Sequence, residues 1–295
     1  RRMSGALSAL GDGYDHEIIY VNDGSTDGSL DQLKALAETD PHVRVIDLSR
    51  NFGHQLAITA GIDAASGDAV VVIDGDLQDP PEVIASMLEK WREGYDVVYG
   101  TRRTRAGETA FKRVTARWFY RLLNGLSEMP LPLDTGDFRL MDRKVVDEFT
   151  SMREETRYVR GMVTWLGFRQ YALEYDRDAR YAGTTKYTLS KMVRLAANGV
   201  ASFSAKPLTL AINFGAAVTV ASFLGLLWII GQRVFFPQTA VQGWASLAVI
   251  VLFLSGVQLM SIGVLGSYVG RVFVEVKGRP LYVVGEAVGF EPPKA

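Results

Sequence analysis

Short apolar segments alternate with segments of helical periodicity along the first hundred residues of the chain. Apolar runs that end in polar residues predict strands at 17–23, 43–49, 69–74 and 96–102. Leucine, isoleucine and alanine at helical spacing predict helices at 29–39, 54–65 and 81–93. This alternation is typical of an α/β domain with a mostly parallel sheet.

Two later segments lack charged side chains altogether. No Asp, Glu, Lys, Arg or His occurs at 207–232 or at 234–270, and only Arg233 separates them. Crossing a bilayer core takes about 20 apolar residues. We therefore predict two transmembrane helices, near 208–231 and 244–268. Two buried helices of a soluble bundle are the weaker alternative, because soluble helices of this length normally carry a charged face.

Basic residues on either side of these segments predict their orientation. Lys191, Arg194 and Lys206 come before the first span, and Arg271, Lys277 and Arg279 follow the second. The positive-inside rule then places the N-terminal part and the tail in the cytoplasm of a multi-pass protein of the inner (plasma) membrane. We expect a catalytic domain at 1–182, a loop and membrane-surface helix at 183–206, two spans within 207–270 and a cytoplasmic tail at 271–295.

Composition narrows the chemistry. The 295 residues carry a net charge of -1, so the overall balance gives no reason to expect nucleic acid as a partner. The absence of cysteine excludes disulfides, thiolate metal sites and cysteine nucleophiles. Three scattered histidines argue against a histidine-rich zinc site.

Polar residues gather where three predicted strands end, in VNDGSTDGS, DGDLQ and GTRR. Ligands of such sheets bind beyond the carboxyl ends of the strands. Asp74 and Asp76 flank one residue at the end of the strand AVVVID, so an extended backbone would aim both the same way. Together with Gln78 they offer only oxygen ligands, which suit Mg²⁺ or Mn²⁺.

Three further segments predict contact with a membrane or an anion. The segment 111–124 reads as a basic amphipathic helix, and 134–149 as an acidic turn that leads into a strand or a short helix. The segment 180–206 reads as a loop followed by a helix on the membrane surface. Cations beside a membrane suit a lipid phosphate, although a solvated helix face is the alternative for any one of them.

Five motifs in this order, followed by two spans, resemble a known family. They are VNDGSTDGS, SRNFGHQLAITAG, VVVIDGDLQDPPE, GTRR and GDFRLMDR. The chain is similar to the membrane-bound polyprenyl-phosphate glycosyltransferases of glycosyltransferase family 2, which include dolichol-phosphate mannose synthases and the bactoprenol glucosyltransferases of O-antigen and cell-wall modification. The resemblance implies a GT-A fold, a nucleotide-sugar donor, a divalent metal and a polyprenyl-phosphate acceptor, and a homotetramer fits the family.

The resemblance also implies roles for individual residues. The metal would be held by Asp74, Asp76 and Gln78. The nucleotide-sugar would contact Asp23, Asn51, Gly53, Asp74, Arg180 and Lys186. The acceptor phosphate would be bound by Arg102, Lys112, Arg113, Arg117 and Arg139. Asp137 matches the family's catalytic base, but a phosphomonoester with a second pKa of about 6 scarcely needs one. Asp137 could instead orient the acceptor or the sugar hydroxyls.

The implied reaction is inverting transfer of glucose from UDP-glucose to polyprenyl phosphate, with GDP-mannose as the alternative donor. A processive polysaccharide synthase is disfavoured because the chain lacks a Q-x-x-R-W motif and further spans. A non-catalytic membrane scaffold is disfavoured by the intact acidic and basic motifs. The family begins with a strand carrying a P-x-Y-N-E type motif, whereas this chain opens with RRMSGALSAL, which reads as the helix after that strand. We therefore expect the first strand to be missing here.

Overall fold

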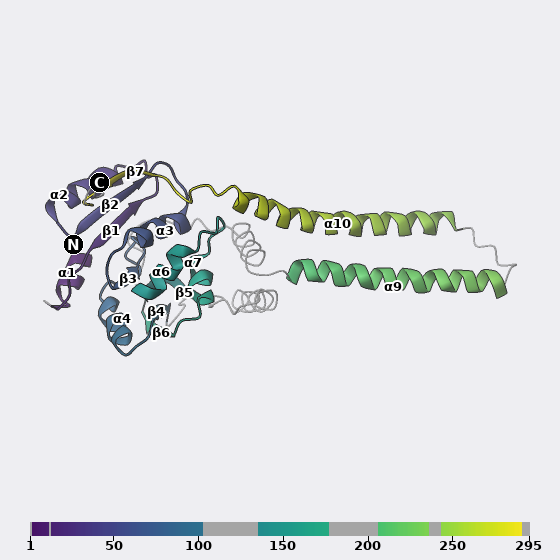
Figure 1. Cartoon of the computed structure of the whole chain (residues 1–295), viewed down its shortest axis with the longest axis horizontal. Helices are drawn as coiled ribbons and strands as arrows, with labels where there is room; N and C mark the ends of the chain where they lie inside the picture. The colour runs from purple at the N-terminus through teal and green to yellow at the C-terminus, as the bar shows by residue number, and fades with distance from the viewer. Residues whose placement is uncertain (1, 12, 103–134, 177–205, 236–242, 291–295) are drawn as a thin grey trace. The chain divides into compact units, whose positions relative to one another are not determined.

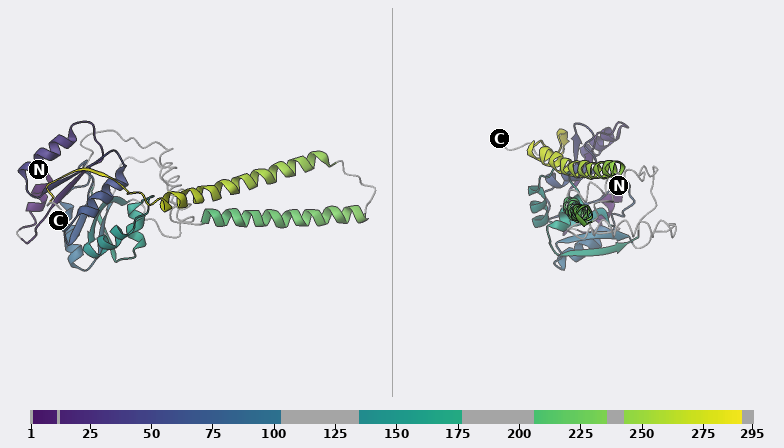
Figure 2. Two further views of the ribbon diagram at one scale, coloured as in Figure 1. Left: turned by 45° about the horizontal axis from the view of Figure 1, so that its top comes forward. Right: turned by 90° about the vertical axis from the view of Figure 1, so that its right-hand side faces the viewer.

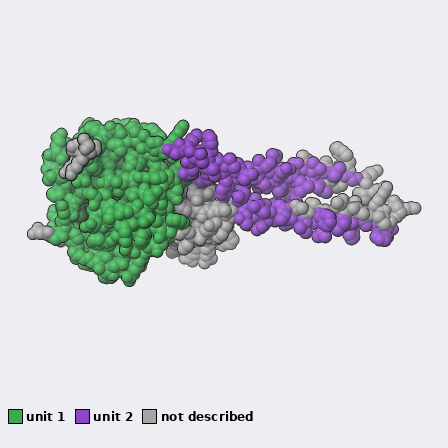
Figure 3. Space-filling view, in the orientation of Figure 1, with its two compact units in different colours: residues 1–120, 130–188, 279–295 green, residues 121–129, 189–278 purple. Residues whose placement is uncertain are grey.

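The computed structural model describes residues 2–11, 13–102, 135–176, 206–235 and 243–290. These residues fall into two compact units (Figure 3). One unit holds the described residues up to 176 together with 279–290. The other holds two long helices, α9 (Lys206–Phe235) and α10 (Trp244–Val276).

A three-stranded sheet forms one part of the first unit (Figure 1). In spatial order its strands are β1 (Ile18–Asn22), β2 (Val43–Leu48) and β7 (Val284–Val288). Strands β1 and β2 are parallel, and β7 is antiparallel to β2. Because side chains alternate between the faces of a strand, Val43 and Val45 pack against α2 (Ser29–Thr39), whereas Ile46 and Leu48 pack against α3 (His54–Ala64).

A four-stranded sheet forms the other part of this unit. Its strands are, in order, β3 (Ala69–Val72), β5 (Thr135–Asp142), β4 (Val97–Arg102) and β6 (Gln170–Tyr175). The associated helices are α4 (Val83–Arg92), α6 (Arg143–Ser151) and α7 (Val159–Trp165). Phe138 and Leu140 of β5 are fully buried against Met87 of α4. Met3 and Leu7 of α1 (Arg2–Ser8) pack against the cores of both sheets.

The prediction of a mostly parallel sheet was wrong. Three of the five pairings among the described strands are antiparallel, so both sheets are mixed. The physical reason is that β5 inserts between β3 and β4 and runs against both, while β7 joins the edge of β2. The segment 134–149, left open as a strand or a short helix, contains β5 and then α6. Asp142 ends the strand and caps the helix by accepting a hydrogen bond from Lys144 N at 3.0 Å.

The other predicted elements of the first hundred residues are confirmed within a few residues. The helix at 29–39 has the predicted bounds, and the opening segment forms α1 as expected of a helix. Strand β3 ends at Val72, two residues before the predicted end. The basic helix at 111–124 lies outside the described residues, as does the predicted loop and surface helix at 183–206 except for Lys206, the first residue of α9.

Both predicted spans are helical, in α9 and α10. Within the described residues, Phe253–Val276 is long and apolar enough to cross a membrane, judged by length and composition. The apolar part of α9, Ala211–Gly225, is shorter. The described part of the chain therefore holds one candidate span where the sequence predicted two. Large apolar side chains such as Trp228 and Met260 are exposed on these helices. Exposed apolar surface of this kind is typical of a helix that contacts lipid.

The segment after α10 packs against the first unit, a feature that the sequence did not predict. Figure 2 shows the yellow strand β7 beside the first strands of the chain. Glu286 pairs with Lys34 of α2 at 2.6 Å, and the Tyr282 hydroxyl donates to Asp63 of α3 at 2.8 Å. The segment therefore contributes a strand and two polar anchors to the unit that it rejoins.

Gly289, next to β7, offers a test of this docking. Its φ is +80°, and a Cβ added there would lie 2.7 Å from the carbonyl oxygen of Val43. Both the strain and the clash, of order 1–3 kcal/mol, should open the docked segment in Gly289→Val. Amide hydrogen exchange of 284–288 is then expected to quicken about tenfold or more. Gly13→Val, where nothing lies within 4 Å, is the control, and unchanged exchange in Gly289→Val would contradict the prediction.

Candidate active site

One hydrogen-bonded junction joins the loop after β1 to the segment that leads into α3. The Asp23 carboxylate accepts from the backbone N–H of Phe52 at 2.6 Å and of Gly53 at 2.9 Å. Asn51 returns a bond from its side-chain amide to the Asp23 carbonyl oxygen at 2.8 Å. Gly24 allows the close approach, since a Cβ there would lie 2.6 Å from Asn51 N. The structure thus brings together Asp23, Asn51 and Gly53, three residues predicted to contact the donor.

The acidic loop that follows β3 is a turn. Because β3 ends at Val72, strand alternation does not aim Asp74 and Asp76, contrary to the argument from an extended backbone. The turn sets the position of Asp76 instead, because Asp76 Oδ1 accepts a hydrogen bond from Gln78 N at 3.1 Å. Leu77 between them has a φ of +57°, an uncommon conformation for a residue with a branched side chain and one that clusters at functional sites.

The end of this loop is anchored in the core. Asp79 is completely buried and accepts a hydrogen bond from the hydroxyl of Tyr175, the last residue of β6. Tyr175 also packs edge-on against Phe138 of β5. The acidic loop is therefore tied at its far end to the four-stranded sheet, which limits its movement relative to β5.

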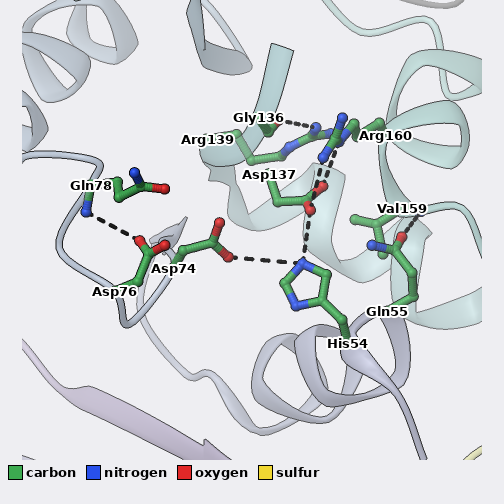
Figure 4. Close-up of polar contacts among 10 residues, drawn as sticks. All are labelled: His54, Gln55, Asp74, Asp76, Gln78, Gly136, Asp137, Arg139, Val159 and Arg160. Atoms are coloured by element: carbon green, nitrogen blue, oxygen red, sulfur yellow. Dashed lines mark hydrogen bonds and ion pairs between the residues drawn. The ribbon is translucent and has the colours of Figure 1, made fainter. Parts of the chain in front are cut away.

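Asp137 of β5 lies opposite the acidic loop and is bound by two basic side chains (Figure 4). His54 Nε2 donates to Oδ2 at 2.9 Å. Arg160 of α7 donates from Nε to Oδ1 at 2.7 Å and from a terminal nitrogen to Oδ2 at 3.1 Å. The same His54 nitrogen lies 3.8 Å from Asp74 Oδ1. His54 therefore stands between the acidic loop and Asp137.

Strand register explains why Asp74 and Asp137 meet. Strand β5 runs antiparallel to β3, with Val72 opposite Arg139. From this pair, two residues forward in the sequence after β3 is Asp74, and two residues back along β5 is Asp137. Two carboxylates sixty-three positions apart in the sequence thus reach the same end of the sheet.

The surroundings shift the pKa values of Asp137 and Asp74 in opposite directions. Burial alone would raise the pKa of Asp137, but the hydrogen bonds from His54 and Arg160 outweigh it and hold the pKa well below its usual range. Burial raises the pKa of Asp74, and the nearby negative charges of Asp137, Asp79 and Asp76 add to this effect. Asp137 is consequently a fixed anion at neutral pH.

Arg139 lies beneath this cluster with only 3% of its surface exposed. It donates to the Gly136 carbonyl oxygen at 3.3 Å, and its Nε has no hydrogen-bond partner among the described residues. Burial lowers the pKa of Arg139 to about 10, so the side chain stays cationic at neutral pH. Its small exposed surface leaves a phosphate little access, so its role in binding the acceptor stays a prediction.

The acidic loop fits a hard divalent cation. Among the described residues no three His, Cys, Asp or Glu side chains form a metal cluster, so the loop offers no complete protein cage. Mg²⁺ usually takes one or two carboxylates and completes its shell with water and substrate phosphates. Asp74, Asp76 and the amide oxygen of Gln78 match that chemistry, and when bound the ion would supply positive charge for a departing diphosphate.

The remaining predicted residues lie at or beyond the limits of the described chain. Arg102 is the last residue of β4, and its side chain is not described. Outside the described residues are Lys112, Arg113, Arg117, Arg180 and Lys186.

Sequence reasoning missed two residues of the site. His54 stands in the RNFGHQ motif, but without the position of Asp137 it had no partner. Arg160 interrupts the apolar run of α7, in which Val159, Met162 and Val163 are fully buried. A lone arginine in such a run indicates a buried anion nearby, which is a signal that the sequence did contain.

The mixed α/β fold and the acidic loop beyond β3 define the class of the protein, a glycosyltransferase with the GT-A type of fold. The sequence pattern of the family described as "Glycosyl transferase family 2" matches residues 4–150. The chain is 52% identical to "Uncharacterized glycosyltransferase YkcC" of Bacillus subtilis, over 94% of this chain and 85% of that protein. It is 44% identical to "Bactoprenol glucosyl transferase" of Shigella phage SfII, over 92% of this chain and 87% of that protein. The chain belongs to glycosyl transferase family 2.

Proposed function

We propose that this enzyme transfers glucose from UDP-glucose to polyprenyl phosphate at the cytoplasmic face of the plasma membrane, with Mg²⁺ or Mn²⁺ at the acidic loop. The observation that carries the proposal is the placement of the Asp74 loop beside the cation-bound Asp137. The name of the phage relative, a bactoprenol glucosyl transferase, supports a polyprenyl acceptor and glucose as the sugar.

The two sides of the site suit the two halves of a transfer reaction. The acidic loop, with its cation, suits the diphosphate of the donor. Arg139 and Arg160 place positive charge on the other side, where a phosphate nucleophile would approach, and His54 adds a hydrogen-bond donor there. The sugar would then lie between them, in reach of Asp137 and His54.

The reaction forms one bond and breaks another at the anomeric carbon. A phosphate oxygen of the lipid attacks this carbon while the bond to the nucleotide diphosphate breaks on the opposite side, which inverts the configuration. The nucleophile is largely ionised near neutral pH, because its second pKa is about 6. Asp137, a bound anion with a depressed pKa, suits orientation of the acceptor or of the sugar hydroxyls better than proton removal.

The membrane part of the proposal rests on α9 and α10. One candidate span in α10 supports membrane attachment. We propose that α9 forms a second span and that the catalytic unit faces the cytoplasm. The basic residues Lys277 and Arg279 immediately after α10 support this orientation, because positive charge near a span favours the cytoplasmic side.

A donor panel tests the proposal. Purified full-length enzyme is incubated with polyprenyl phosphate, Mg²⁺ or Mn²⁺ and radiolabelled UDP-glucose or GDP-mannose, and lipid-linked label is extracted. We expect label from UDP-glucose, and none after chelation of the metal. Label from GDP-mannose alone would overturn the choice of donor. No lipid-linked sugar from any donor would overturn the enzyme function itself, leaving nucleotide binding without turnover as the mark of a scaffold.

A further inference from the structure

We propose that His54 is a positioning residue of the transfer step, which holds the Asp137 carboxylate in the orientation that the reaction requires. The inference rests on the proposed function and assigns a role to a side chain outside the acidic loop. It is drawn from the way three separate elements meet: α3 supplies His54, β5 supplies Asp137 and α7 supplies Arg160 (Figure 4).

The hydrogen bond defines which nitrogen of the ring acts. An ionised carboxylate only accepts hydrogen bonds, so the proton of the contact must be on His54 Nε2. The 2.9 Å separation from Asp137 Oδ2 is that of a hydrogen bond, whereas the 3.8 Å separation from Asp74 Oδ1 is too long for one. His54 is therefore bonded to Asp137 and only adjacent to the acidic loop.

Arg160 and His54 each make the shorter hydrogen bond to a different oxygen of the Asp137 carboxylate. Arg160 holds Oδ1 closely, at 2.7 Å, but reaches Oδ2 only at 3.1 Å. The closer contact to Oδ2 is the one from His54. Asp137 has only 3% of its surface exposed, so bulk water has little access to replace a lost donor. Without His54, Oδ2 keeps the longer bond alone, and the carboxylate can turn about its contact with Arg160.

The position of His54 in its helix argues against a purely structural role. It is the first residue of α3, and its side chain is 53% exposed. The packing of α3 comes from its buried residues Thr59, Ala60 and Ile62. Replacing His54 therefore removes little buried apolar surface, and its effect should appear in the reaction rather than in the fold.

Two amide substitutions, His54→Gln and His54→Asn, test whether the hydrogen bond to Asp137 matters or whether any polar side chain suffices. Glutamine carries its amide nitrogen the same number of bonds from Cβ as histidine carries Nε2, whereas the amide nitrogen of asparagine is one bond closer and cannot reach. We expect His54→Gln to retain most of kcat. His54→Asn and His54→Ala should each lose about 10- to 100-fold in kcat, as for a misplaced reacting group. The KM for the donor and the metal requirement should not change.

His42 gives matched control variants, because it also pairs with an aspartate, Asp40 at 3.1 Å, on an exposed surface. His42→Gln and His42→Asn should both keep full activity. Equal losses in His54→Gln and His54→Asn would overturn the proposal. So would a change in the metal requirement with kcat intact, because His54 would then serve the acidic loop.

A spectroscopic readout separates this inference from the proposed function. In full-length protein labelled with ¹⁵N-histidine, we expect one Nε2–H signal that exchanges slowly with water and that disappears in His54→Gln. If wild type makes no lipid-linked sugar, the proposed function fails, while this signal still reports whether the bond to Asp137 exists. Absence of such a signal from wild type would overturn the positioning role, whatever the activity.

Discussion

Asp76→Ala is expected to lower the rate of lipid-linked sugar formation by about 1,000-fold or more. A metal ion contributes several kcal/mol of charge stabilisation to such a reaction, and each 1.36 kcal/mol is tenfold in rate. Asp76 is one of the two carboxylates proposed to hold the metal, so its removal leaves Asp74 and Gln78 as the remaining protein ligands. The measurement is initial rate with radiolabelled donor, at a series of Mg²⁺ and Mn²⁺ concentrations.

The control for Asp76 must separate metal binding from loop shape. Asp76 Oδ1 also accepts a hydrogen bond from Gln78 N, at 3.1 Å, and alanine removes this bond as well. Asp76→Asn keeps an acceptor for Gln78 N but removes the charge. We expect both variants to be inactive. An active asparagine variant would show that the aspartate shapes the turn, and an active alanine variant would remove the metal assignment.

Arg160→Met is expected to destabilise the catalytic unit by about 3 kcal/mol, because it leaves the Asp137 carboxylate buried with one partner. The figure is the lower end for breaking a buried ion pair, since His54 remains and the Arg160 side chain is 30% exposed. A loss of this size lowers the midpoint of thermal unfolding by roughly 10 °C in a domain of this size. Thermal unfolding of full-length protein in detergent measures it.

A second substitution identifies the cause of that loss. In Arg160→Met with Asp137→Asn the buried charge is gone, so we expect part of the lost stability to return. If the double variant is as unstable as the single one, lost packing of the arginine stem is responsible, and the unpaired charge is not.

The stability lost in Arg160→Met should depend on pH, in a direction that follows from the pKa of Asp137. In wild type the folded pKa of Asp137 is depressed, so its stabilisation is present above the unfolded pKa of about 4 and is lost as the pH falls through the lower folded value. In Arg160→Met only the hydrogen bond from His54 still opposes burial, so the pKa of Asp137 should rise above its wild-type value, and the folded variant should bind this proton at a higher pH than folded wild type. The gap in stability between wild type and variant should therefore narrow from pH 7 to pH 4. A constant gap would show that ionisation of Asp137 is not involved.

The local elements were readable from sequence because their signals are local. The helix at 29–39 was predicted with its observed bounds, since leucine and alanine at helical spacing mark one amphipathic helix. Strand directions were not readable in this way. The direction of β5 depends on its pairing with β3 and β4, whose sequences lie far from it along the chain.

The residues of the acidic loop lie together as predicted, but the predicted reason for their orientation was wrong. Asp74, Asp76 and Gln78 were selected because they follow an apolar strand, and they do lie together after β3. Alternation along an extended strand does not orient them, however, because the strand ends at Val72 and a turn with Leu77 at positive φ takes over. The end of this loop is held by the Tyr175–Asp79 contact, which joins residues ninety-six positions apart.

By itself the sequence determined the α/β class and the family, and it predicted the acidic loop and Asp137 as parts of the site, because composition, periodicity and ordered motifs lie along the chain. Only the tertiary structure decided what surrounds Asp137. His54 and Arg160 come from helices far apart in sequence, and both reach Asp137 because α3 and α7 each contact α6, which packs against β5. The same holds for β7, which joins β2 across more than two hundred residues. Such contacts arise from packing between elements, and no local pattern encodes them.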